Sequence, residues 1–212
     1  AMGAGGQKAF LVPVILDSIE AMTERLQAGA TVVDIGCGAG VAATTVAQAF
    51  PNTNVIGMDP SSHAIASASA RAAEAGLDNL SFRQGTFDDL GEFADVDLLL
   101  TLDVIHDLPR PGAAVRSARG CLADDGVWMV ADIRARGGLE DNRAIPVLPL
   151  MYGMSILYCM SSAMSEPGGA GLGTLGLTTG VFEEMTQAAG FTGFASREFD
   201  VDAMNRYYEV RP

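Results

Sequence analysis

The chain has 212 residues, of which 49% are hydrophobic, a length and composition that suit one folded domain with a full core. Its 13 basic and 26 acidic residues give a formal charge of −13, which repels a phosphate backbone and argues against a nucleic-acid substrate. The three cysteines are widely separated, so they predict neither a disulfide framework nor a zinc site. We therefore expect a cytoplasmic protein with no bound metal.

Residues 8–27 carry the first clear pattern. Their apolar side chains recur near the helical period, which predicts an amphipathic helix that covers a sheet. Pro13 falls early enough to be tolerated, or marks a break. We expect residues 1–28 to form a lead and a covering helix, and residues 29–212 to form a single α/β domain.

A glycine turn, Asp-Ile-Gly-Cys-Gly-Ala-Gly at residues 34–40, follows a predicted strand and precedes a predicted helix over residues 41–50. Gly36, Gly38 and Gly40 allow a sharp turn with no Cβ in the way, so a ligand can lie against the main chain. Asp59 ends the next predicted strand, about twenty residues further on, where a carboxylate can accept hydrogen bonds from ribose hydroxyls.

The glycine spacing helps to separate two cofactor classes. For a dinucleotide motif the third glycine comes one residue early, and Val41 occupies its last position. Asp34 would repel a pyrophosphate and attract an ammonium or sulfonium cation. The pattern therefore favours S-adenosylmethionine over NAD, and the hydride-transfer acid of a dehydrogenase is not found. An ordinary tight turn without a ligand is the competing interpretation.

The rest of the chain alternates strand and helix patterns. Ser61 or Ser62 is expected to cap a helix that ends at Gly76. The apolar residues 96–100 are typical of a central parallel strand. We predict further strands at 55–58, 80–84 and 126–132, helices from 109 or 111 to 121 and from 178 or 179 to 190, and a C-terminal hairpin of strands 191–199 and 204–210. The expected fold is α/β, a Rossmann-like, mostly parallel sheet flanked by helices, with an antiparallel C-terminal hairpin strand.

Residues 144–165 contain no charged side chain. Prolines, a glycine and serines interrupt the stretch, and later strands must return to the same sheet, so a membrane crossing is not expected. Its apolar residues fall on every side, which predicts a helix buried under its own domain, against the partner of a possible homodimer, or around a hydrophobic substrate. The glycine-rich residues 165–180 predict a mobile flap, with an irregular crossover as the alternative.

These motifs carry a family resemblance. D-I-G-C-G-A-G resembles motif I of the class I S-adenosylmethionine-dependent methyltransferases, and G-M-D-P-S resembles their motif II. Residues 104–109, 152–160, 171–177 and 208–212 resemble a branch with an N-terminal winged-helix domain, for which too few residues precede Thr31. We expect a shortened relative or an excised catalytic domain. The resemblance implies S-adenosylmethionine as the methyl donor and S-adenosylhomocysteine as the product.

The resemblance also indicates where the cofactor would lie. Phe87, after the third strand, is expected to lie against the adenine, with Thr86 or a backbone amide at its edge. Many relatives carry an acidic residue at the position of Thr86, so Asp88 is a candidate substitute, or else part of a solvated turn. The predicted cofactor-binding residues are Asp34, Gly36, Cys37, Gly38, Gly40, Asp59, Pro60, Thr86, Phe87, Thr101 and Leu102.

His106, backed by Asp107, is the candidate catalytic base. An ordinary histidine pKa near 6.5 leaves it mostly neutral at pH 7, able to take a proton from an acceptor hydroxyl. A His-Asp pair at the corresponding place is the proposed catalytic dyad of many small-molecule O-methyltransferases. A residue that only shapes the pocket is the equally weighted alternative. Asp103 is expected to contact the methionine ammonium or the acceptor, or to cap the following turn.

Two classes of function remain open at this point. The first is an enzyme that methylates a small, uncharged or cationic acceptor, with no nucleic acid and no membrane as partner. The second is a regulatory or scaffold domain that binds S-adenosylmethionine without turnover. Tyr152, Tyr158 and Met160 are candidates for lining an acceptor pocket, although packing alone also explains them. The residues indicate neither the acceptor nor which of its atoms is methylated.

Overall fold

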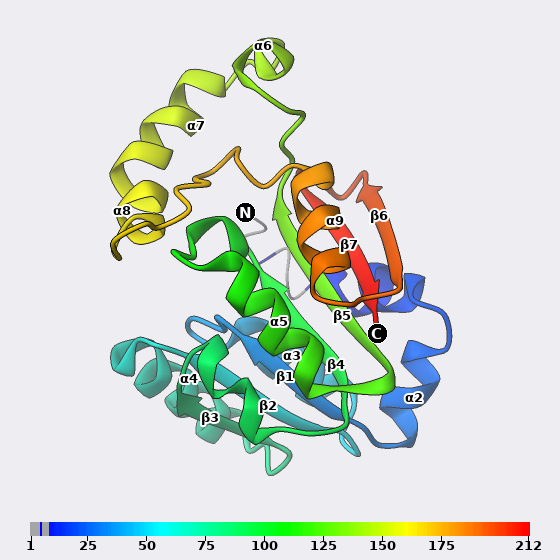
Figure 1. The fold of residues 1–212 in the computed structure, drawn as a ribbon. Helices are drawn as coiled ribbons and strands as arrows, with labels where there is room; N and C mark the ends of the chain where they lie inside the picture. The colour runs from blue at the N-terminus through cyan, green and yellow to red at the C-terminus, as the bar shows by residue number, and fades with distance from the viewer. Residues whose placement is uncertain (1–4, 6–8) are drawn as a thin grey trace.

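The computed structural model describes residue 5 and residues 9–212 of the chain. The described strands form one seven-stranded sheet in the order β3-β2-β1-β4-β5-β7-β6 (Figure 1). Strands β1 to β5 pair in parallel, and β7 pairs antiparallel with β5 and β6. The strands are β1 Thr31–Ile35, β2 Asn54–Asp59, β3 Leu80–Gln84, β4 Val96–Leu102, β5 Leu122–Ile133, β6 Gly193–Phe199 and β7 Asp202–Arg211. The predicted fold class, including the C-terminal hairpin, is confirmed.

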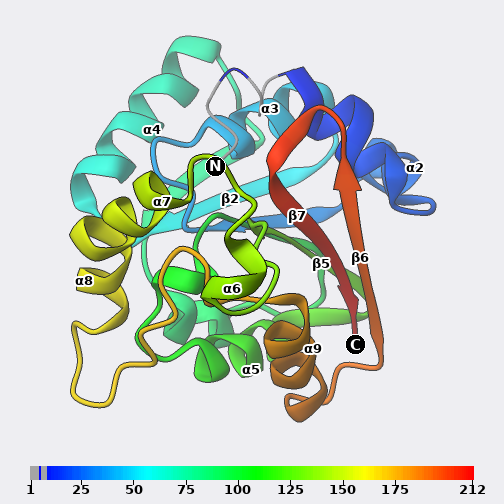
Figure 2. The ribbon, with the colours of Figure 1, turned by 90° about the horizontal axis from the view of Figure 1, so that it is seen from above.

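Helices cover both faces of this sheet, as Figure 2 shows from above. α3 (Val41–Ala49) and α4 (Ser62–Ala75) pack on one face, and α5 (Pro111–Cys121) and α9 (Thr179–Ala188) on the other. On β4, Leu98 and Leu100 enter the first core and Leu99 enters the second, because successive side chains of a strand point to opposite faces. The core therefore has two layers, one on each side of the sheet.

The helix boundaries follow local chemistry that the sequence displays. The Ser61 hydroxyl accepts a hydrogen bond of 3.2 Å from the backbone N–H of Ala64, and Gly76 ends the helix in the left-handed conformation at φ +63°. The Thr178 hydroxyl caps α9 in the same way, accepting from the N–H of Val181 at 3.3 Å. Both predicted caps are confirmed.

The N-terminal region differs from the prediction. In place of one helix over residues 8–27 there is a π-helical turn at Leu11–Ile15, a 3₁₀ turn at Leu16–Ser18 and the helix α2 at Met22–Ala28. The chain breaks because Ile19 is extended and Ala21 has a φ of +58°; Lys8 lies outside the described residues. The predicted continuous helix is wrong. Its apolar face is nonetheless buried against the sheet, as predicted.

The uncharged stretch also differs from the prediction. It forms α7 (Leu148–Met154), a π-helical turn (Ser155–Cys159) and α8 (Met160–Ala163), and with α6 (Leu139–Asn142) it stands above the carboxyl edge of the sheet (Figure 1). Burial on every side under its own domain is wrong, because Ile156, Leu157 and Tyr158 are 67 to 71% exposed. None of the helices within the described ranges has the length and apolar character that a membrane crossing requires.

Candidate active site

A glycine turn follows the last residue of β1 and lies against the tip of β2. The backbone N–H groups of Gly36 and Cys37 donate hydrogen bonds of 2.8 and 2.9 Å to the carbonyl oxygen of Met58. Gly36 has a φ of +76°, and a Cβ added to it would lie 2.5 Å from the Val104 side chain. Only glycine therefore meets both the conformation and the packing at this position.

Gly38 and Gly40 share the left-handed conformation, with φ of +53° and +73°, but differ in their surroundings. A Cβ on Gly40 would lie 2.4 Å from the ring of Phe82, so packing excludes a side chain there. Apart from its chain neighbours, no atom of the described residues lies within 4 Å of a Cβ placed on Gly38. The turn therefore presents bare backbone to an open space at Gly38, which direct contact between a ligand and the main chain requires.

Two predicted carboxylates lie on different sides of this turn. Asp34 is buried beneath it, and its Oδ2 accepts a hydrogen bond of 3.2 Å from the backbone N–H of Ala43. Burial raises the pKa of Asp34 to about 7, against the opposing effect of that hydrogen bond. Asp59 lies at the rim, where Oδ2 accepts from the N–H of Gly38 at 3.0 Å and Oδ1 accepts from that of Ser61 at 2.9 Å.

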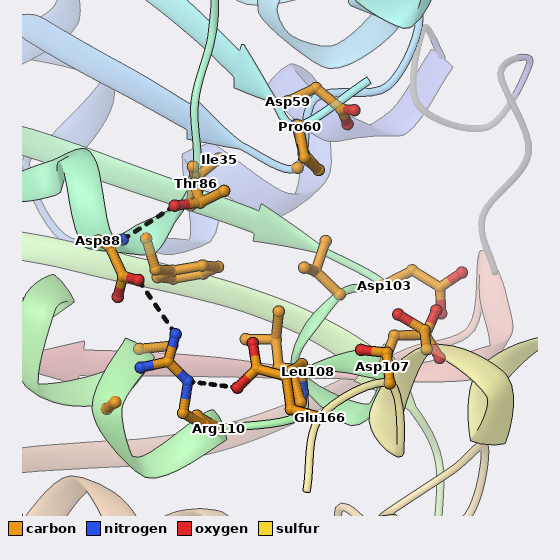
Figure 3. Close-up of a pocket in the computed structure, with 18 residues that line it drawn as sticks. Ile35, Asp59, Pro60, Thr86, Asp88, Asp103, Asp107, Leu108, Arg110 and Glu166 are labelled. Atoms are coloured by element: carbon orange, nitrogen blue, oxygen red, sulfur yellow. Dashed lines mark hydrogen bonds and ion pairs between the residues drawn. The ribbon is translucent and has the colours of Figure 1, made fainter. Parts of the chain in front are cut away.

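A cavity of about 620 Å³ opens at the carboxyl ends of β1, β2 and β4 (Figure 3). The strand order reverses between β1 and β4, and open α/β sheets bind ligands at such a reversal. Eight of the predicted site residues line the cavity: Gly36, Asp59, Pro60, Thr86, Phe87, Asp88, Asp103 and Asp107. Its wall also includes Val104, Arg110 and Glu166.

The remaining predicted residues lie outside the cavity wall, and these are Asp34, Cys37, Gly38, Gly40, Thr101, Leu102, His106, Tyr152, Tyr158 and Met160. Thr101 is fully buried, and its hydroxyl accepts a hydrogen bond of 2.9 Å from the indole N–H of Trp128. Leu102 packs against one core layer. The fold thus gives Thr101 and Leu102 structural contacts, and their part in cofactor binding stays a prediction.

The loop after β3 forms one wall of the cavity and begins a 3₁₀ turn at Phe87–Glu92. Both the N–H and the hydroxyl of Thr86 donate to Oδ2 of Asp89, at 2.7 and 3.2 Å, so the loop itself occupies them. Asp88 is exposed, and its Oδ2 lies 3.2 Å from Nη2 of Arg110. Two side chains are candidates for the adenine edge. Thr86 is bonded within the loop, whereas the Asp88 carboxylate contacts Arg110 from outside the loop.

Arg110 also contacts the glycine-rich segment that follows α8. Its Nε lies 2.9 Å from Oε2 of Glu166 (Figure 3). Four residues further on, the N–H of Ala170 donates a hydrogen bond of 2.9 Å to the carbonyl oxygen of Pro109. The segment predicted as a flap is thus fastened beside the cavity by these contacts, and its mobility stays a prediction.

His106 lies between two carboxylates. Its Nδ1 is 2.7 Å from Oδ1 of Asp132, a fully buried residue near the end of β5, and its Nε2 is 3.2 Å from Oδ1 of Asp107. Burial alone lowers the pKa of His106, but the hydrogen bond and charge of Asp132, with the charges of Asp107 and Asp103, outweigh it and raise the pKa to about 10. The expectation of a mostly neutral ring at pH 7 is therefore wrong, because these carboxylates stabilise the charged form.

Asp132 is the site residue that sequence reasoning missed. The sequence paired His106 with its neighbour Asp107, whereas Asp132 makes the shorter contact from a strand 26 residues away. An available signal was an aspartate near the end of an apolar strand that reaches the ligand-binding edge. Potential metal ligands meet here, since atoms of Asp103, His106 and Asp132 lie within 4.8 Å of one another, as do those of His106, Asp107 and Cys159. The absence of a bound metal stays a prediction.

Asp103 combines backbone strain with an unpaired polar atom. Its φ is +65°, which is uncommon for a residue other than glycine, and its N–H donates a hydrogen bond of 2.7 Å to the carbonyl oxygen of Ala131. Its Oδ1 is buried with no hydrogen-bond partner among the described residues, and burial raises its pKa. Its side chain does not cap the following turn, which is the 3₁₀ turn Ile105–Asp107. A positive φ and an unpaired buried oxygen are typical of a residue that contacts a ligand.

Comparison with known proteins assigns the chain to a family. A family model described as a methyltransferase domain matches residues 26–153, more than half of the chain. The chain belongs to this methyltransferase family. The class I resemblance of the two glycine and aspartate motifs is thereby confirmed.

The methyltransferase is 29% identical over 115 residues to a ubiquinone biosynthesis O-methyltransferase of Azorhizobium caulinodans, covering 54% of this chain and 44% of that protein. It is 30% identical over 146 residues to a trans-aconitate 2-methyltransferase of Methylobacterium radiotolerans, covering 69% of this chain and 52% of that protein. The chain spans about half the length of the curated relatives it matches.

Solved structures share the fold at low identity. Human N-acetylserotonin methyltransferase in complex with S-adenosylmethionine matches 98% of this chain and 51% of its own, with a TM-score of 0.67 and 16% identity. An O-methyltransferase family protein from Burkholderia thailandensis matches 93% of this chain and 54% of its own, with a TM-score of 0.66 and 16% identity.

The raised pKa of His106 has a measurable consequence. In the methyltransferase the ring should stay protonated at pH 8 and lose its proton near pH 10, as followed by NMR of the imidazole. Replacement of the other histidine, His63→Gln, makes the assignment unambiguous. Asp132→Asn should lower the pKa of His106, because it removes the strongest stabilising partner of the charged ring.

The same shift affects stability with a defined sign. The pKa of His106 is raised above its unfolded value near 6.5, so the stabilisation it provides is complete below pH 6.5 and is lost as pH rises through about 10. The free energy of unfolding of the wild type should therefore fall between pH 7 and 10 more steeply than that of Asp132→Asn. A ring that titrates near pH 6.5 in both proteins would contradict this account.

Proposed function

We propose that this methyltransferase moves a methyl group from S-adenosylmethionine to a small-molecule acceptor. The observation that carries the proposal is the bare backbone at Gly38, which is hydrogen-bonded to the carboxylate of Asp59, a residue that lines an open cavity. S-adenosylmethionine supplies a methyl group that is activated by a positively charged sulfur. The structural neighbour that was solved with this cofactor supports the choice of donor.

The residues of the cavity suit the parts of that cofactor. Asp59 would accept hydrogen bonds from the ribose hydroxyls, and Phe87 would lie against the adenine. Asp88 would accept a hydrogen bond from the adenine amino group. The main chain at Gly38 would contact the methionine part, and Asp34 beneath the turn would add negative charge near the cation.

The charge of the cavity wall favours a particular class of acceptor. Five carboxylates line it, from Asp59, Asp88, Asp103, Asp107 and Glu166, against the single guanidinium of Arg110. Arg110 is already paired with two of them. We infer that the acceptor is uncharged or cationic, because an anion such as the trans-aconitate that names one relative would be repelled.

We further propose that His106 removes the acceptor proton and that Asp132 holds its ring in place. The 2.7 Å contact between Nδ1 and Asp132 leaves Nε2 directed at Asp107, which lies on the cavity wall. With a pKa of about 10 the ring is protonated at neutral pH, so the base would be its minor neutral form, in which Nδ1–H donates to Asp132 and the unprotonated Nε2 takes the acceptor proton once Asp107 has moved aside. Most of the rate enhancement would come from holding donor and acceptor together, at about 7–11 kcal/mol, against about 3–5 kcal/mol for a positioned base.

A labelled-methyl assay tests the function directly. The full chain is incubated with methyl-labelled S-adenosylmethionine and matched panels of phenols, amines and carboxylic acids. We expect label in members of the first two panels and none in the third, whereas Asp103→Asn should reduce the preference for amines over phenols. Tight cofactor binding with no transfer to any compound would instead favour a domain that binds S-adenosylmethionine without turnover.

The pH dependence of kcat tests the proposed base. With a pKa of about 10, the neutral form of His106 grows about tenfold with each pH unit between 7 and 9, so kcat should rise with a logarithmic slope near one. His106→Gln should be about 100-fold slower at pH 9 and should lose this slope. A slope that persists in the variant would come from ionisation of the acceptor, and would assign His106 to shaping the pocket only.

A further inference from the structure

A second cavity, of about 540 Å³, lies beyond the end of β5 at the start of α9, beside β6 and β7. It shares no lining residue with the cavity proposed to hold the cofactor and acceptor. Its wall is formed by Arg134, Ala135, Arg136, Gly137, Thr178, Thr179, Gly180, Glu198 and Arg206.

The charge of this wall is opposite to that of the protein. Three of the 13 basic residues of a chain with a net charge of −13 line it, with a single acid. Glu198 forms ion pairs with both Arg134 and Arg206, so two of the three positive charges are uncompensated. Arg136 is exposed and forms no ion pair with any described residue. An anion bound here would meet positive charge that the fold has not neutralised.

The other polar groups of the wall also suit an anion. Nη1 of Arg206 is fixed by hydrogen bonds of 2.7 Å to the Thr179 hydroxyl and 3.3 Å to the carbonyl oxygen of Ala135. The backbone N–H groups of Thr179 and Gly180, in the first turn of the ten-residue α9, have no intrahelical partner. An anion could accept hydrogen bonds from these groups and from Arg136 together.

A buried hydroxyl provides an independent indication. Tyr208 is 1% exposed, and its hydroxyl lies against Thr179 and Arg206, two residues of the cavity wall. The hydroxyl is near enough to both for weak hydrogen bonds, but none of normal geometry joins it to any described residue. Tyr208 does not itself line the cavity, so a water held between its hydroxyl and this wall would give it a partner.

A smaller cavity of about 160 Å³ adjoins this 540 Å³ cavity, since Arg134 and Arg136 line both. Its other walls are mostly apolar and come from Ala144, Ile145, Pro146, Met151, Ala203 and Met204. We propose that the two cavities form one site for a small organic anion, a phosphate monoester or a carboxylate. Its charged group lies among the guanidinium groups and the start of α9, and its apolar part lies against this second wall.

Calorimetric titration of the full chain tests this site with phenyl phosphate, benzoate and inorganic phosphate as probes. We expect saturable binding of phenyl phosphate or benzoate, and binding of phenyl phosphate that is tighter than that of inorganic phosphate. Arg136→Gln should raise the Kd about tenfold or more, because it removes a charged donor. Arg143→Gln removes the same charge from an exposed residue outside both cavities, and should change the Kd less than about twofold.

Met204→Ser addresses the apolar half, at a side chain that is 40% exposed and tolerant of change. It should weaken the binding of phenyl phosphate and leave the binding of inorganic phosphate unchanged. Equal losses from Arg136→Gln and Arg143→Gln would overturn the proposal, since they would indicate a general effect of charge. No saturable binding of any probe up to about 10 mM would overturn it as well. The outcome does not depend on S-adenosylmethionine, so it is separable from the proposed methyl transfer.

Discussion

The backbone contact between the glycine turn after β1 and the end of β2 is the constraint on which the rest of the site depends. The parallel register pairs Ile35 with Met58, and the carbonyl oxygen of Met58 then receives both N–H groups that begin the glycine turn. The same register brings the Asp59 carboxylate to the N–H of Gly38. A glycine turn, an acidic rim and a bare stretch of backbone therefore arise together from one strand pairing.

Burial acts on the ionisable groups of this edge in two different ways. At Asp34 the loss of solvent dominates, and its pKa rises to about 7. The carboxyl group is therefore partly protonated at neutral pH, and a cation bound nearby would favour its ionised form. At His106 the loss of solvent is the largest single effect, but the hydrogen bond and charge of Asp132 with the charges of Asp107 and Asp103 together outweigh it, and the ring keeps its proton at neutral pH. The free Oδ1 of Asp103 adds a third buried group whose partner is not supplied by the described chain. The burial of Asp34 and Asp103 costs stability, whereas the contact of His106 with Asp132 adds it, and ionisable groups with shifted pKa values are typical of sites that bind and react.

The parts of this structure that sequence predicted well are those set by neighbouring residues. Continuous apolar runs such as β4, the caps at Ser61 and Thr178, and the glycine turn each depend on local chemistry. The break at Ala21 could not be predicted in this way, because an alanine at a positive φ has no signal in the local sequence. The contact of His106 with Asp132 and the cluster of Arg134, Arg136 and Arg206 join distant segments, which only the folded sheet brings together.

The binding of S-adenosylmethionine to Gly38→Asn, measured by calorimetry beside the wild type, tests the central claim most directly. Asparagine tolerates the left-handed conformation, and a Cβ at this position meets no atom within 4 Å apart from its chain neighbours, so the variant should fold. Its side chain would fill the space assigned to the cofactor. We predict that the wild type binds S-adenosylmethionine with a Kd in the micromolar range. The variant should bind it about 100-fold or more weakly. Equal affinity in the two proteins, or no binding by a folded wild type, would contradict the account.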